Sequence, residues 1–184
     1  MPGRKVDTMN LYLSGMIGSG KTTLGRLLSD RLEVPMLDLD EEMDRRLGYS
    51  FHELVAEHGW VPFRELEYSI CKSFAEAKGS VVCLGGGTVR YEWNRDVLRG
   101  TGVMVLLEAR EDVLIERVSK ADRPRVHRDT SLAEDVRRIW REHAETYRRA
   151  ADIIYRTDEK ELPEEIEELL SIARSDPRLS PLFA

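Results

Sequence analysis

The chain has 184 residues, of which 41% are hydrophobic and 34% are charged, with 13 glycines and 7 prolines. This length fits a single domain, and the composition excludes the low-complexity, collagen-like and disordered classes. The formal net charge of −6 argues against nucleic acid as a partner, because a phosphate backbone repels an acidic protein at long range.

Short apolar segments alternate with longer amphipathic stretches from end to end, and this alternation predicts an α/β fold. The middle apolar segments carry almost no polar residues, as strands covered on both faces must, so we expect a parallel sheet. The five expected strands, in chain order, are Asn10–Leu13, Met36–Leu39, Ser80–Leu84, Val103–Leu107 and Ile153–Tyr155.

Amphipathic stretches between and after these strands predict helices. The expected helices are Thr23–Leu32, Pro62–Ala77, Ser131–Arg149 and Pro163–Ala173. Ser131 with Glu134 three residues later predicts a capping box at the start of the third. We expect one domain over residues 1–184, with ragged ends at 1–9 and 175–184.

The segment after the first strand spells a phosphate-binding loop. Residues 15–22 read Gly-Met-Ile-Gly-Ser-Gly-Lys-Thr, which satisfies G-x-x-x-x-G-K-[ST], the Walker A pattern. Its glycines let successive backbone N–H groups turn towards an anion at the positive end of the following helix. Lys21 can bridge the outer phosphates and the Thr22 hydroxyl can ligate Mg²⁺, so the loop implies ATP or GTP with magnesium rather than a merely glycine-rich turn. The candidate nucleotide-binding residues are Gly15, Gly18, Ser19, Gly20, Lys21, Thr22 and Thr23.

Two acids follow at the end of the second expected strand. Asp38 and Asp40 are two residues apart, so on an extended strand they would point to the same side, at the sheet edge where ligands bind. Phosphoryl transfer needs one acid near the metal and another near the acceptor hydroxyl. The alternative is a pair of solvent-facing acids ahead of Glu41 and Glu42.

Two further patterns indicate an acceptor site. Gly85, Gly86 and Gly87 end a buried strand, and a backbone without Cβ atoms permits close approach of a substrate. Arg64 precedes Glu67 by three residues on one helix face, a pair able to hold the guanidinium in one orientation. The alternatives are a flexible turn and a surface ion pair.

A polar stretch over residues 119–130 contains three arginines, among them Arg123, and is too long for a tight turn. Such a loop can close over a nucleotide and bring positive charge to the transferring phosphoryl group. A solvated basic loop is the alternative.

Together, and in this order, these motifs resemble the shikimate kinase family of small P-loop kinases, over about Leu11 to Ala173. The resemblance implies a three-layer α/β/α fold with a five-stranded parallel sheet and a mobile lid at about 119–130, and it implies ATP and Mg²⁺. By the same resemblance, Thr22 and Asp38 bind the metal, and Arg123 reaches the phosphates. The resemblance also implies that Asp40, Arg64 and Gly85–Gly87 bind the cyclic acid and that Arg117 lies near the adenine.

The chain departs from the family pattern mainly on the acceptor side. Members of the family have the pattern R-x-P-L-Y on a late helix, and its arginine binds the substrate carboxylate. At the aligned positions 143–147 this chain has His-Ala-Glu-Thr-Tyr. His143 is therefore the candidate at that position, although a histidine binds a carboxylate only weakly and only when protonated, and the alternative is a partly buried helix histidine without a ligand. Arg141 lies about 200° around the helix from that position and would face away. Smaller departures are Arg125-Val126 after the lid Arg-Pro, Gly59-Trp60 before Phe63-Arg64, and Cys83 in place of serine.

These observations predict an enzyme that transfers a phosphoryl group from ATP to a hydroxyl of a small cyclic hydroxy acid, with Lys21, Asp40 and Arg123 as catalytic residues. Shikimate is the first candidate acceptor, giving shikimate 3-phosphate in aromatic amino-acid biosynthesis. One alternative is a kinase of the same fold for another polyol or hydroxy acid such as gluconate. A second, of a different class, is a catalytically silent ATP-binding switch.

The two cysteines form no disulfide framework, no apolar run reaches eighteen residues, and the first residues lack a signal-like apolar core. We therefore expect a cytoplasmic monomer with no membrane partner.

Overall fold

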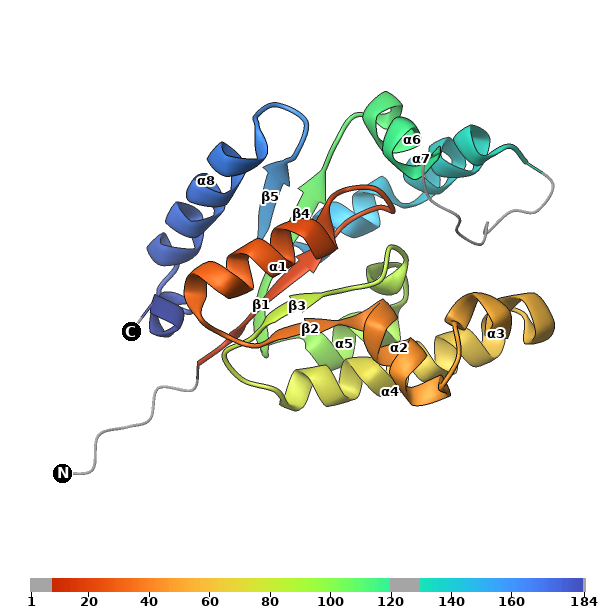
Figure 1. The fold of residues 1–184 in the computed structure, drawn as a ribbon, viewed down its shortest axis with the longest axis horizontal. Coiled ribbons are helices and arrows are strands. Elements are labelled where there is room, and N and C mark those ends of the chain that lie inside the picture. The colour runs from red at the N-terminus through yellow and green to blue at the C-terminus, as the bar shows by residue number, and fades with distance from the viewer. Residues whose placement is uncertain (1–7, 120–129, 184) are drawn as a thin grey trace.

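A computed structural model of the chain describes residues 8–119 and 130–183. Five parallel strands form one sheet in the order β2-β3-β1-β4-β5 (Figure 1). Their bounds are β1 Asn10–Ser14, β2 Met36–Asp38, β3 Val81–Cys83, β4 Gly102–Glu108 and β5 Ile153–Arg156. The five strands and the parallel sheet expected from the apolar segments are confirmed.

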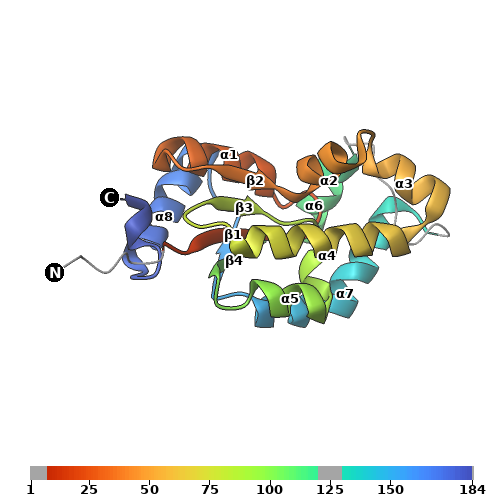
Figure 2. The same cartoon turned by 90° about the horizontal axis from the view of Figure 1, so that it is seen from below.

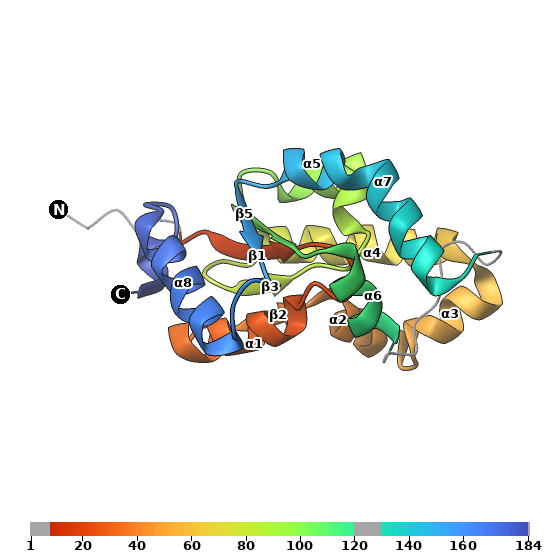
Figure 3. The ribbon, with the colours of Figure 1, turned by 90° about the horizontal axis from the view of Figure 1, so that it is seen from above.

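Helices cover both faces of this sheet. They are α1 Lys21–Leu32, α2 Leu39–Leu47, α3 Phe51–His58, α4 Trp60–Glu76, α5 Glu92–Leu98, α6 Glu111–Ser119, α7 Leu132–Ala150 and α8 Leu162–Ser175, with 3₁₀ turns η1 Thr88–Arg90 and η2 Ser180–Phe183. Helices α1 and α8 lie on one face, and α4, α5 and α7 lie on the other (Figures 2 and 3). Within the described residues, none of these helices has the length and apolar character needed to cross a membrane.

Alternating strand residues divide the core into two layers, because successive side chains of a strand point to opposite faces. Leu11 and Leu13 of β1 pack into the layer under α1 and α8, whereas Tyr12 between them packs into the layer under α4 and α7. Each face is apolar, which is why these strands read as continuous apolar runs in the sequence. The capping box that Ser131 and Glu134 predict at the start of α7 is present.

All five strands end at the same edge of the sheet, and the loops of interest leave from that edge. The phosphate loop leaves the central strand β1 and runs into α1, and the glycine turn leaves β3 beside it. Sites of open parallel sheets form at this edge. Helices α2 and α3 extend beyond it, as Figure 1 shows.

The expectation that Asp38 and Asp40 share one extended strand is wrong. Strand β2 ends at Asp38, and helix α2 begins at Leu39, so Asp40 lies in the first helical turn. The cause is local: the Asp38 carboxylate accepts hydrogen bonds from the backbone N–H groups of Asp40 and Glu41, and acidic residues stabilise the positive end of a helix.

The C-terminal end also differs from the ragged tail expected after Arg174. Helix α8 continues to Ser175, and the following residues fold into η2. Leu179 and Leu182 are buried in the layer under α1 and α8, and burial of these two side chains offsets the entropy lost in ordering the segment.

Candidate active site

The phosphate loop joins β1 to α1 through a backbone that only glycines allow. Gly18 has φ 82°, and a Cβ added there would lie 2.7 Å from the Val118 Cγ2 atom. Lys21 folds back over the loop, and its Nζ donates to the carbonyl oxygens of Gly15 and Met16 at 2.9 Å each. The Ser19 hydroxyl is buried and has no hydrogen-bond partner among the residues that the structure describes.

A cavity of about 680 Å³ opens over this loop. Of the candidate nucleotide-binding residues, the lining includes Gly18, Ser19, Gly20, Lys21, Thr22, Thr23 and Arg117. Gly15 does not line the cavity, and its part is to accept the hydrogen bond from Lys21. The structure therefore brings the consecutive loop residues together around one volume, which we call the nucleotide cavity.

Arg117 anchors the phosphate loop from helix α6. Its guanidinium donates to the carbonyl oxygen of Thr157 at 2.8 Å and to that of Gly18 at 3.4 Å, while the Thr157 hydroxyl donates to the carbonyl oxygen of Ser19 at 3.1 Å. Thr157 carries no motif, so sequence reasoning missed it. Its position two residues after the apolar run of β5, at the strand end, is the one signal that indicates a site residue.

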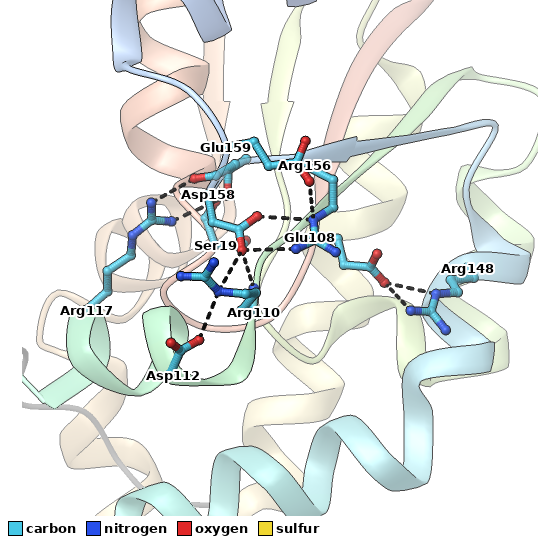
Figure 4. Close-up of polar contacts among 10 residues, drawn as sticks. Ser19, Glu108, Arg110, Asp112, Arg117, Arg148, Arg156, Asp158 and Glu159 are labelled. Carbon is cyan, nitrogen blue, oxygen red and sulfur yellow. Dashed lines mark hydrogen bonds and ion pairs between the residues drawn. The ribbon is translucent and has the colours of Figure 1, made fainter.

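Charged residues brace the rim of the nucleotide cavity beside this anchor. Figure 4 shows Arg110 and Arg156 reaching Asp158 from two sides, and Arg148 directed to Glu108. Burial opposes ionisation of Asp158, but hydrogen bonds from the Arg156 side chain and the Arg110 N–H outweigh it and leave the pKa of Asp158 below its ordinary value. Asp158 thus stays charged and holds the β5–α8 connection in place.

Thr22 and Asp38, the two candidate metal ligands, are in contact. The Thr22 hydroxyl donates to Asp38 Oδ2 at 2.9 Å, while Oδ1 of the same carboxylate caps α2. One hydroxyl and one carboxylate oxygen at the edge of a phosphate site are hard oxygen donors of the kind that Mg²⁺ prefers. The residues present therefore fit a magnesium ion shared with phosphate oxygens.

A second, smaller cavity lies beside the first, and we call it the acceptor cavity. Apolar side chains form about half of its lining, and charged side chains, among them Arg64 and Glu67, form the rest together with the three glycines Gly85–Gly87. The predicted pair is present: Arg64 Nη1 donates to Glu67 Oε2 at 2.7 Å, with the side chains 12% and 0% exposed. This is a buried ion pair, and the surface pair considered above is excluded.

Further hydrogen bonds hold Glu67 in place. Thr88 Oγ1 donates to Oε1 at 2.8 Å, and Asn94 Nδ2 donates to Oε2 at 3.1 Å. Arg64 in turn lies over the rings of Phe63 and Tyr91, with its guanidinium carbon 4.7 and 4.5 Å from their centroids. A fully paired Glu67 and an aromatic enclosure leave Arg64 a single orientation.

The two cavities meet at Asp40. Ile17, Asp40 and Gly86 line both of them, so the Asp40 carboxylate lies between the phosphate loop and the acceptor cavity. A Cβ at Gly86 would approach the Ile17 N atom to 3.2 Å, so a larger residue at this junction would press on the phosphate loop. Tyr147 donates to the carbonyl oxygen of Gly86; burial raises the pKa of Tyr147 to about 12, so the phenol keeps the proton it donates.

Two sequence-predicted residues are not brought into the described site. His143 lies on α7 with its side chain 34% exposed and is not part of either cavity lining. Arg123, the predicted lid arginine, falls outside the described residues.

The acceptor cavity also contains polar residues that sequence reasoning missed. Arg90 and Asp135 line it, and Thr88 and Asn94 support its buried ion pair. Thr88 and Arg90 directly follow the glycine turn, and this proximity is the signal that could have found them. Asp135 comes from the start of α7, far along the chain, and no local pattern marks it.

The comparisons with known proteins agree with this geometry. The model of the family described as shikimate kinase matches residues 17–174. The shikimate kinase of Chlorobium luteolum is 37% identical over 167 residues, covering 86% of this chain and 82% of the relative. That of Rhodopirellula baltica is 33% identical over 179 residues, covering 95% and 96%. Among solved structures, the shikimate kinase of Acinetobacter baumannii in complex with shikimate has a TM-score of 0.86 at 26% identity, covering 96% of this chain and 99% of that one.

Proposed function

The chain belongs to the shikimate kinase family, and from this premise we propose that it transfers a phosphoryl group from ATP to a hydroxyl group of shikimate. The observation that carries the proposal is the position of Asp40, which lines both the nucleotide cavity and the acceptor cavity. A carboxylate at that junction can reach an acceptor hydroxyl beside a bound phosphate tail.

On the nucleotide side, the backbone N–H groups of residues 16–21 and the Lys21 ammonium hold the phosphate tail of ATP. Lys21 keeps two carbonyl contacts within the loop, so its charge is already positioned when the nucleotide binds. Preorganised positive charge stabilises the negative charge of the transferring phosphoryl group and needs no rearrangement during the reaction.

Thr22 and Asp38 would hold Mg²⁺, which neutralises charge on the phosphate oxygens when bound. The second Asp38 oxygen caps α2 through Asp40 N and Glu41 N, so the metal-side carboxylate also fixes the helix turn that carries Asp40. One side chain thereby sets the relative position of the metal site and the proposed base.

On the acceptor side, Asp40 orients the acceptor hydroxyl and accepts its proton as the new O–P bond forms. In the same transfer the bond between the γ-phosphorus and the bridging oxygen breaks, with ADP as the leaving group. Arg64, held by Glu67, and the open backbone of Gly85–Gly87 bind the rest of the acceptor.

A coupled assay of ADP release tests this function. Purified protein with MgATP is offered shikimate, gluconate and a panel of other cyclic and linear hydroxy acids. We expect ADP release that depends on shikimate and the product shikimate 3-phosphate by mass spectrometry. No release with shikimate, or faster release with gluconate, would contradict the proposed acceptor. ADP release that depends on an acceptor would also dismiss the silent ATP-binding switch.

A further inference from the structure

The acceptor cavity contains a second arginine, Arg90, to which the proposed function gives no part. It is the last residue of η1 and lines the cavity together with Arg64. Its backbone is held firmly, because Arg95 Nη1 donates to the carbonyl oxygens of Arg90 and Val89 at 3.0 and 2.8 Å. Arg90 therefore enters the cavity from a fixed turn.

The guanidinium of Arg90 has no polar partner among the described residues. Its Nε is buried without a hydrogen bond, it forms no ion pair with Asp40 or Asp135, and its ring contact is with Tyr91, at 5.9 Å from the centroid. Arg64 Nε is likewise buried without a hydrogen bond, but the Arg64 guanidinium is neutralised by its ion pair with Glu67. A partly buried cation without a counter-ion is unfavourable, so an anionic ligand would stabilise this arrangement.

The two arginines converge on one point of the glycine turn. The position that a Cβ of Gly87 would occupy lies 2.6 Å from Arg90 Nη2 and 3.1 Å from Arg64 Nη2. Both charges also act on Tyr147, whose phenol is hydrogen-bonded to the neighbouring Gly86. Two guanidinium groups beside a residue without a side chain form a site that fits a planar carboxylate.

We propose that Arg90, together with Arg64, binds the carboxylate of the hydroxy-acid acceptor and makes the enzyme select an acid over its neutral analogue. The proposal rests on the proposed function, since it assigns one group of that acceptor. In this proposal the cation that binds the carboxylate is Arg90, from η1 directly after the glycine turn. His143, at the late-helix position, lies outside the cavity lining.

The test compares two substrates in two variants. Wild-type protein, Arg90→Met and Arg90→Lys are assayed with shikimate and with its carboxamide, at saturating MgATP. We expect Arg90→Met to lower kcat/KM for the acid about 100-fold, mainly through KM, and to leave kcat/KM for the amide within about 3-fold. Arg90→Lys keeps the charge without the bidentate geometry, so its kcat/KM for the acid should lie between those of the wild type and Arg90→Met.

Arg141→Met is the matched control, because it removes one arginine from the exposed side of α7. Arg141→Met should leave kcat/KM unchanged for both the acid and the amide. Thermal unfolding of each variant checks that it is folded. If Arg90 has only a structural role, Arg90→Met would lower kcat/KM for the acid and for the amide by the same factor. That result would overturn the assignment. Wild-type protein without shikimate-dependent ADP release would overturn the proposed function instead. Wild-type turnover with an unchanged acid-to-amide ratio in Arg90→Met overturns the Arg90 proposal alone.

Discussion

The lining of the nucleotide cavity includes one continuous stretch of the chain, residues 17–24 of the phosphate loop and the start of α1, whereas the acceptor cavity collects side chains from α2, α3, α4, η1 and α7. In this stretch Gly18 and Gly20 have positive φ, a backbone conformation that favours glycine and lets backbone N–H groups face a bound anion. In the acceptor cavity, the contacts come from side chains that are far apart in the sequence and are supported by others, as Glu67 supports Arg64.

This difference determines how each cavity responds to substitution. A loop that binds through its backbone depends on a few local conformations, so most of its side chains can change and its function rests on Lys21 and the glycines. In a cavity built from side chains, a cationic side chain from one helix or turn can take the place of a cationic side chain from another, and the cavity still binds the same ligand group. We infer that the acceptor side has done so, with Arg90 in place of a cation at position 143.

Replacement of Lys21 by methionine tests the nucleotide side and should have the largest effect. We expect turnover to fall about 10⁴-fold, because the charge on the transferring phosphoryl group loses its fixed cation. The thermal unfolding midpoint should change little, since the side chain is only partly buried over the loop and its hydrogen bonds to the carbonyls of Gly15 and Met16 lie at the loop rather than in the core. Lys78→Met, at an exposed position, is the control. Near-normal ADP release by Lys21→Met would rule out this nucleotide site.

Asp40→Asn tests the junction of the two cavities. Loss of the proposed base should lower kcat about 10³-fold, with KM for MgATP nearly unchanged. Steady-state kinetics with both substrates varied would separate these effects. Glu41→Gln, one residue further along α2 and exposed, should retain wild-type kcat. If Asp40→Asn changes only KM, Asp40 binds the acceptor without taking its proton.

Glu67→Gln tests the side-chain support of the acceptor cavity. Removing the charge leaves Arg64 uncompensated, and we expect the free energy of unfolding to fall by about 3 kcal/mol. Urea unfolding measures this loss, with the exposed Glu65→Gln of the same helix as the control. A loss below about 0.5 kcal/mol would mean that the buried pair adds no net stability, contrary to its geometry.

Alkaline pH tests the packing of α1 against β3 behind the nucleotide cavity. Burial, and to a smaller extent the nearby Asp38 carboxylate, raises the pKa of the Cys83 thiol from 9.0 to about 12. Above pH 9 the unfolded chain releases this proton while the folded chain keeps it, so stability is fully present below pH 9 and falls as pH rises towards 12. By pH 10 the loss is about 1 kcal/mol.

Cys83→Ser should remove this part of the slope while keeping a donor for the Lys21 carbonyl, to which the thiol is 3.3 Å away. Chemical unfolding between pH 8 and 10.5 measures the slope in the variant and in the wild type. An identical slope in both would show that the thiol is accessible to ionisation in the folded protein.

His143→Ala should have the smallest effect. Because His143 lies outside the lining of the acceptor cavity, we expect KM for shikimate to change less than about 2-fold. Kinetics at pH 6 and pH 8 would reveal any contribution of a protonated imidazole. A tenfold rise in KM at pH 6 would place His143 in the acceptor site and weaken the case for Arg90.

The sequence predicts the strands closely because buried parallel strands are continuous apolar runs, and it predicts the Arg64–Glu67 pair because residues three apart share a helix face. The prediction that Asp40 lies on the same extended strand as Asp38 is wrong. The two-residue alternation of a strand stops at Asp38, because Asp38 is the N-cap of α2. The prediction of a ragged tail is also wrong, since burial of Leu179 depends on a surface that α8 and the sheet create together.

Local patterns in the chain specify the phosphate loop and the strands, because each depends on residues that are neighbours in the sequence, and the order of several such motifs identifies the family. Which side chains share the acceptor cavity follows instead from how the elements fold together. Arg64 and Arg90 come together through the packing of α4 against the turn after β3, and His143 is left aside by its position on α7. Contacts between distant elements depend on how those elements pack, and no spacing within one segment specifies that packing.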